Sequence, residues 1–361
     1  MRLRTVLATV TAGLAAATTL TAAGPVTAAQ VTVAPVGATN ACSPSVSIAG
    51  FSDALDKTTY EGTFVGNFSA LAVDRNGQIA AVSDRSSLFT LDAKTLAPTS
   101  VVPLADENGA ALDSEGLVVD LPHSRLRSTG GTPIGTRLIS SETEPSVRRY
   151  SRDGQILGRL PVPDSLKVAP AGRATSNQTF EGLTLLPGGR TLLAAMEGSL
   201  SGDTTGIVRF QTWDRKAAGK TFQLAAQYGY RTDTGLGVSE VTATPDGRLL
   251  VLERGFTAGV GNTVRLYLAD PRHATDTGDE ATLTGQDGVR LVRKTLLADL
   301  VNCPSLGATA KQPQPNPLLD NIEGLTTTGS TKGRLNLLLV SDDNQNAAQI
   351  TRFYFLRVRL P

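Results

Sequence analysis

The chain has 361 residues, of which 40% are hydrophobic and 19% charged, so it can bury a substantial core and lacks the charge excess of a disordered protein. Its 34 Lys and Arg against 33 Asp and Glu leave a net charge of +1, which argues against a nucleic-acid binder. The 36 glycines make up about 10% of the chain, above the usual ~7%, and are typical of a protein with many tight turns.

Residues 1–29 have the pattern of a secretory signal peptide. Arg2 and Arg4 precede an apolar run over residues 6–23, and Thr27-Ala28-Ala29 forms a small-residue cleavage site. A membrane anchor is the alternative, but Gly24-Pro25 would break a spanning helix. We therefore expect a secreted, extracellular protein whose residues 30–361 form one domain and contact no membrane.

Two cysteines, Cys42 and Cys303, follow the signal segment. Export permits a disulfide between them, which would tie the N-terminal segment to a late loop; two free thiols are the alternative. A zinc centre is disfavoured because the histidines, His123 and His273, lie in loop-like contexts.

An internal repeat runs through the rest of the chain. Each unit is a short strand, a turn containing glycine and a second, nearly continuous apolar strand, which is a strong β-hairpin signal. Further strands follow most hairpins, for example at 206–210, 263–268 and 289–292. The five units begin at Phe68, Ser114, Phe180, Ser239 and Ile322.

About four strands per unit predict an all-β fold, a β-propeller with five four-stranded blades. The last unit has three strands of its own, and the N-terminal run 46–51 could supply the fourth and close the ring. The long interval between Glu240 and Glu323 leaves room for a sixth blade. Residues 121–136, 271–288 and 305–318 are expected to be loops.

The repeat places an acidic residue near the start of four first strands, while the first unit has Ser69 there. First strands line the channel of a propeller, so these carboxylates should converge on one axis. An oxygen-rich cluster without Cys or His favours a hard cation, Ca²⁺ before Mg²⁺ or Mn²⁺. The alternative is that each acid accepts backbone N–H groups from a neighbouring blade. The predicted metal ligands are Glu115, Glu181, Glu240 and Glu323.

A second set of acids ends the second strands, and two of them have an arginine beside them. Arg85 follows Asp84 and Arg254 follows Glu253. Arginine can clamp a phosphate or carboxylate through two parallel hydrogen bonds, or it can form a salt bridge between blades. The acids of this set are Asp84, Glu142, Glu197, Glu253 and Asp342.

Several ordered segments resemble the phytase-like family, described as having esterase-like activity of phytase. The resemblance covers about residues 50–360, and its segments are 68–74, 81–85, 180–183, 261–267, 322–325, 341–344 and 351–358.

This resemblance implies a calcium-dependent phosphomonoesterase that holds Ca²⁺ with acids around the propeller axis. It assigns metal binding to Glu115, Glu181, Glu240 and Glu323, and substrate binding to Arg85 and Arg254. The chain departs from a phosphate-rich phytase site because it has no lysine cluster near the acids and has Ser69 where other units have Glu.

Three functions stay open. The first is a secreted metal-dependent esterase, most plausibly a phosphoric monoester hydrolase that acts on a small-molecule ester as a monomer. The second is a non-catalytic extracellular propeller that binds a ligand. The third is a calcium-dependent lactonase or carboxylesterase. A Ser-His-Asp hydrolase is disfavoured because the chain has no Gly-x-Ser-x-Gly motif.

Overall fold

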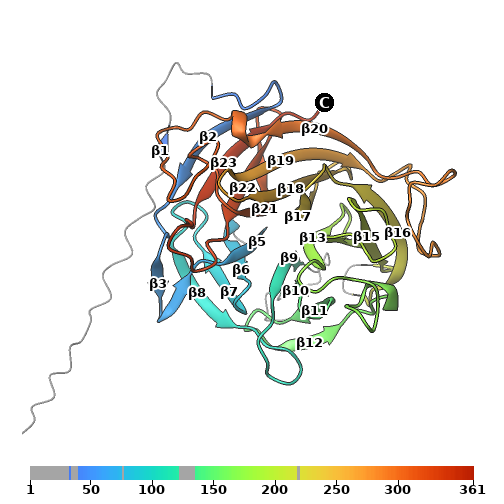
Figure 1. The fold of residues 1–361 in the computed structure, drawn as a ribbon. Helices are drawn as coiled ribbons and strands as arrows, with labels where there is room; N and C mark the ends of the chain where they lie inside the picture. Colours follow the sequence, from blue (N-terminus) through green and yellow to red (C-terminus); the bar gives the residue numbers. More distant parts are fainter. Residues whose placement is uncertain (1–31, 34–39, 75–76, 122–134, 218–219) are drawn as a thin grey trace, which may run out of the picture.

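A computed structural model describes residues 32–33, 40–74, 77–121, 135–217 and 220–361. The predicted signal segment and most of the predicted loop 121–136 lie outside these ranges. Within them the chain forms a five-bladed β-propeller, and each blade is an antiparallel four-stranded sheet (Figure 1). Among the described residues, no helix is long and apolar enough to cross a membrane.

The first three blades follow one another along the chain. Blade one contains β5 to β8, blade two β9 to β12 and blade three β13 to β16. Their strands are, in order, Phe68–Val73, Ile79–Ser83, Ser87–Leu91 and Pro98–Pro103; Ser114–Asp120, Thr136–Ser141, Ser146–Tyr150 and Ile156–Arg159; and Phe180–Leu185, Thr191–Met196, Ile207–Asp214 and Gln223–Arg231.

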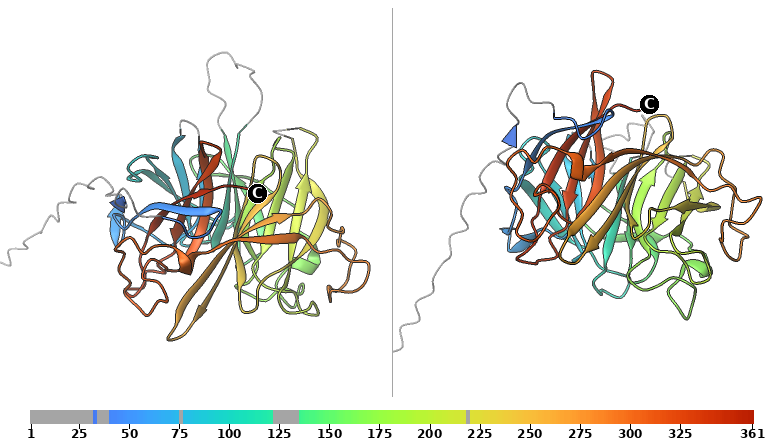
Figure 2. Two further views of the ribbon diagram at one scale, coloured as in Figure 1. Left: turned by 90° about the horizontal axis from the view of Figure 1, so that it is seen from above. Right: turned by 45° about the horizontal axis from the view of Figure 1, so that its top comes forward.

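Blade four contains β17 (Gly237–Ala243), β18 (Leu249–Thr257), β19 (Gly261–Asp270) and β20 (Arg293–Asp299). Its outer strand begins just after the predicted 289–292 segment. The interval thought to allow a sixth blade is filled by long strands, loops and the short helix η3 (Leu300–Asn302), so the blade number is five. The β18–β19 hairpin projects from one face of the ring (Figure 2).

Blade five closes the ring as predicted. Its strands β21 (Ile322–Thr331), β22 (Arg334–Ser341) and β23 (Phe353–Val358) come from the end of the chain, and β2 (Val46–Ser52) pairs with β23 from the other end. The short strand β1 (Thr32–Val33) pairs with β2, and β3 (Thr58–Tyr60) and β4 (Thr63–Val65) form a separate hairpin. A disulfide joins Cys42, just before β2, to Cys303, just after η3.

The core consists of five hydrophobic clusters, and each one takes side chains from two neighbouring blades. Aromatic residues fill several of these interfaces, including Trp213 between blades two and three and Phe89 between blades five and one. Burial of these faces explains why the second strands are apolar on both sides. The packing fixes the five first strands around a common channel, where β5, β9, β13, β17 and β21 lie innermost (Figure 1).

Candidate metal and anion-binding site

Every first strand carries a β-bulge near its start, and the bulge decides which side chain faces the channel. In β5 the pairing with β6 jumps from Phe68 to Ala70, and in β21 it jumps from Ile322 to Gly324. The other three first strands have the same irregularity. An extra residue in one strand re-aims its side chain at that point. The residues that directly follow the pair at which the jump begins are Ser69, Glu115, Glu181, Ser239 and Glu323.

Glu240 is separated from the other three predicted ligands. Ser239 occupies the bulge position in β17, so Glu240 stands where β9 and β13 have glycine. Its Oε1 accepts the backbone N–H groups of Leu183 at 3.1 Å and Val241 at 2.9 Å. Glu240 therefore connects blade four to blade three, which is the alternative role considered for these acids.

The glycines after Glu115 and Glu181 have a steric reason. A Cβ on Gly116 would lie 2.5 Å from the Cβ of Leu183, and one on Gly182 would lie 2.5 Å from the backbone nitrogen of Val241. Each glycine thus lets the first strand of the next blade approach closely, so that the two glutamates stand on adjacent, tightly packed strands.

The second strands bring a further row of side chains to the same end of the channel. Four members are the predicted acids Asp84, Glu142, Glu197 and Asp342. Their backbone N–H groups donate, at 2.8–3.0 Å, to the carbonyl oxygens of the residues just before the first strands of their own blades. In blade four this position belongs to Arg254, which pairs with Gly237.

Glu253, which the sequence placed in this row, lies apart from it. Its carboxylate accepts hydrogen bonds from the Tyr230 hydroxyl at 2.6 Å and from the ammonium of Lys294 at 2.5 Å. A one-residue difference in register therefore places the basic Arg254, rather than the acidic Glu253, at the channel in blade four.

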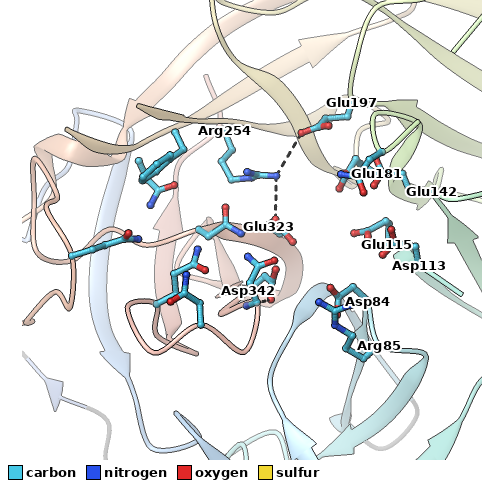
Figure 3. Close-up of a pocket in the computed structure, with 18 residues that line it drawn as sticks. Asp84, Arg85, Asp113, Glu115, Glu142, Glu181, Glu197, Arg254, Glu323 and Asp342 are labelled. Atoms are coloured by element: carbon cyan, nitrogen blue, oxygen red, sulfur yellow. Dashed lines mark hydrogen bonds and ion pairs between the residues drawn. The ribbon is translucent and has the colours of Figure 1, made fainter. Parts of the chain in front are cut away.

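The two rows line one cavity of about 450 Å³ at the end of the channel (Figure 3). Blades two and three contribute most of its acids, and Arg254 of blade four faces them across the opening (Figure 3). The lining has eight carboxylic acids and two arginines, so full ionisation would give it a net charge of −6. The acids are Asp84, Asp113, Glu115, Glu142, Glu181, Glu197, Glu323 and Asp342; the arginines are Arg85 and Arg254.

Two groups of three acids bring their oxygens close enough to share a cation. In each group the acids offer oxygens that lie within 4.8 Å of one another. One group is Asp113, Glu115 and Glu142; the other is Glu142, Glu181 and Glu197. Glu142 belongs to both, and it comes from the second acidic row rather than the first. Asp113 was missed by the sequence analysis because it precedes β9 and lies outside the repeated strand pattern.

Burial and mutual repulsion raise the pKa values of these acids. The pKa of Glu115 is well above its usual range because of burial, with the charges of Glu323 and Asp113 adding to it. Burial likewise raises the pKa of Glu181, and Glu115 is its strongest charged neighbour. Burial and Glu197 raise the pKa of Glu142 to about 7. Such a concentration of acids stays ionised only when positive charge enters it.

A divalent cation would relieve this repulsion. Asp113 with Glu115, and Glu142 with Glu181, offer oxygens that lie within 4.8 Å of each other. Oxygen-only donors are the set that Ca²⁺ prefers.

Arg254 and Arg85 lie in different environments. The Arg254 guanidinium lies 3.1 Å from Glu323 and 3.5 Å from Glu197, only 17% of its side chain is exposed, and these acids raise its pKa (Figure 3). Arg85 is 61% exposed and lies 3.6 Å from Asp84. Arg254 is therefore a paired, largely buried cation inside the cavity, and Arg85 is an exposed one at its rim.

A family model described as "Phytase-like: Esterase-like activity of phytase" matches residues 63–345, which include all eight acids and both arginines of the cavity. The chain belongs to this phytase-like family of esterases. The match agrees with the sequence resemblance. No curated protein matches the chain in sequence.

Among solved structures, a crystal structure of a protein of unknown function from Bacteroides caccae is similar to this one. The alignment covers 74% of this chain and 68% of that chain with 11% identity and a TM-score of 0.33. This similarity is too low to carry an argument about the phytase-like chain.

Proposed function

We propose that this phytase-like chain is a secreted, calcium-dependent hydrolase of phosphoric monoesters. The observation that carries the proposal is the pairing, in one cavity, of two carboxylate groups joined by Glu142 with a buried arginine that faces them. The acids suit a hard cation and the arginine suits an anionic substrate group.

The residues of the two carboxylate groups would hold the metal. Asp113, Glu115, Glu142, Glu181 and Glu197 all have oxygens within the spacing that shared coordination needs. A bound cation of this kind supplies polarisation of a phosphoryl oxygen and lowers the pKa of a coordinated water. The Glu142 carboxylate is held in place because its Oε1 accepts the backbone N–H of Thr179 at 3.0 Å.

Arg254 would bind the phosphate. Its Nε is buried and has no hydrogen-bond partner among the described residues, and its Nη2 forms ion pairs with Glu197 and Glu323. A phosphate oxygen would meet this donor in a site shielded from water, where charge-assisted hydrogen bonds are strong. The neighbouring Glu197 and Glu323 keep the guanidinium in position.

Asp84 is the acid best suited to carry a proton to or from the substrate. Burial, with the charges of Asp342 and Asp113 adding to it, raises its pKa to about 7. Its Oδ1 is buried and has no hydrogen-bond partner within the described ranges. An acid with a pKa near the working pH is an efficient general acid or base, and Asp84 lies outside both carboxylate groups.

The test is to purify residues 30–361, remove metal with a chelator and assay phosphate and carboxylate esters with and without added Ca²⁺. We expect Ca²⁺ to restore phosphate release from 4-nitrophenyl phosphate. Restored cleavage of carboxylate esters or lactones alone would show the other esterase class. Stabilisation by Ca²⁺ without turnover of any ester would show a binding protein and refute the proposal.

A further inference from the structure

One side of the cavity is built from carboxamides. Seven of its eighteen lining residues are Asn or Gln, and six of them come from blade four, blade five and the segments that connect these blades. Within the lining this side faces the carboxylates of blades two and three. The six residues are Asn262, Gln312, Asn321, Asn344, Asn346 and Gln349.

Asn262 has a buried carboxamide without a partner. The residue is 1% exposed, and neither its Oδ1 nor its Nδ2 has a hydrogen-bond partner in the part of the chain that the structure describes. Its backbone is held in place, because its N–H donates to Oε1 of Gln314 at 2.8 Å. Leaving a buried donor or acceptor unsatisfied costs about 1–3 kcal/mol, so this amide is suited to a ligand that supplies both partners.

Phe256 places an aromatic ring beside this amide. It is directly opposite Asn262 in the β18–β19 pair, so both side chains lie on the same face of the hairpin. Phe256 is 56% exposed and lines both the acidic cavity and an adjoining groove of about 600 Å³. An exposed ring next to hydrogen-bonding amides can cover the C–H face of a ring-shaped polar ligand while the amides bind its edge.

The β22–β23 loop adds amides at the opening. Asn344 and Gln345 adopt left-handed backbone conformations with φ of 47° and 50°, and the Asn344 N–H donates to Asp342 Oδ1 at 2.8 Å. Asn adopts this conformation more readily than most residues do. The turn therefore fixes Asn344 next to an acid of the cavity and positions the amide side of the opening.

We infer that the amide side binds the leaving group of the substrate, and that this group carries several uncharged hydroxyls, as a sugar or polyol does. The inference rests on the proposed function, because it names the ester that the same cavity would cleave. Each carboxamide offers donors and an acceptor, which match the paired donor and acceptor roles of neighbouring hydroxyls. Among the described lining residues, Arg85 and Arg254 are the only basic side chains against eight acids, so the lining stays negative even with one bound Ca²⁺ and disfavours a leaving group with further phosphates.

The test compares glucose 6-phosphate with n-hexyl phosphate, two monoesters with six-carbon leaving groups, in saturating Ca²⁺. We expect kcat/KM to favour glucose 6-phosphate by about tenfold or more, since sites built to bind hydroxyls reject analogues that lack them. Asn262→Leu should bring this ratio near one, whatever the absolute rates. Asn344→Gly, which keeps the left-handed turn, should lower the ratio by a smaller factor.

The matched control is Asn336→Leu, because Asn336 pairs with Gly329 in the β21–β22 hairpin and does not line the cavity. This variant should keep the wild-type ratio. Equal kcat/KM for the two esters in the wild type, or an unchanged ratio in both cavity variants, would overturn the inference while leaving phosphatase activity intact.

Failure of the proposed function has a different signature, namely no phosphate release from these esters or from 4-nitrophenyl phosphate. Saturation-transfer NMR with the same two esters then decides the inference. Tighter binding of glucose 6-phosphate that is lost in Asn262→Leu supports it, and equal or absent binding of both esters overturns it.

Discussion

Blades two and three differ from blade four at two equivalent positions, and this difference sets the chemistry of the cavity. Blades two and three present Glu115 with Glu142 and Glu181 with Glu197, whereas blade four presents Ser239 with Arg254. The backbone bulge is the same in all three. A repeated scaffold can therefore place acidic and basic side chains side by side by changing two side chains in one blade.

The largest effect should come from Glu142→Gln, because Glu142 belongs to both carboxylate groups. We expect Ca²⁺ affinity to fall by about a hundredfold or more, since removing even an outer-shell partner of a metal ligand costs 10–100-fold. Isothermal titration calorimetry measures this. The control is Glu240→Gln, which keeps an oxygen for the Leu183 N–H and should bind Ca²⁺ as the wild type does. Equal losses in the two variants would erase the distinction between Glu240 and the acids that line the cavity.

Arg254→Gln should change two affinities in opposite directions. Loss of a charge-assisted hydrogen bond should raise KM for 4-nitrophenyl phosphate about 10–100-fold. Loss of a positive charge beside the acids should strengthen Ca²⁺ binding by about tenfold. Arg85→Gln should change either quantity by less than about threefold, because Arg85 is mostly exposed. A parallel fall in both affinities would instead point to a general disruption of the cavity.

The stability of the metal-free protein should decrease as pH rises. Asp84 and Glu142 have folded pKa values of about 7 and Asp342 about 6, all above the values of 3.8–4.5 expected without burial. Acids with raised pKa values stabilise the fold when protonated, and this contribution is lost between about pH 4 and pH 7. Melting curves in chelator should show the loss, and added Ca²⁺ should reverse it by several degrees at about pH 8 but hardly at about pH 4.5. A melting temperature that rose with pH in chelator would contradict these shifts.

The smallest effect should come from Glu240→Ala, which probes the contact between blades four and three. Without the carboxylate, the buried N–H of Leu183 loses its acceptor, which should lower the free energy of unfolding by about 1–3 kcal/mol. Chemical denaturation measures this change. Ca²⁺ affinity should stay at the wild-type value. A loss of Ca²⁺ binding would show that Glu240 acts together with the acids that line the cavity.

The propeller could be predicted because hairpins leave a local pattern. Alternating apolar strands, glycine turns and the run 46–51 at the N-terminus are visible in the residues themselves, and the five-bladed ring with its closing strand agrees with them. The placement of Glu115, Glu181 and Glu323 at the channel also followed from the repeat.

The register of blade four could not be read from residue type alone. A bulge shifts the pairing by one residue, and such a shift exchanges which side chains face the channel. Spacing to the turn carries a usable signal, because Glu181 stands six residues before Pro187 and Ser239, not Glu240, stands six residues before Pro245. Asp113 has no such signal, because only the folded conformation of the segment before β9 brings it beside Glu115.

We expect the acids of blades two and three to hold a divalent cation that faces Arg254. A crystal soaked in Ca²⁺ and measured at a long wavelength, where calcium scatters anomalously, should show a peak bounded by Glu142 and the other members of the two carboxylate groups, with Glu240 still bonded to Leu183. The absence of a peak at this position would refute the calcium site.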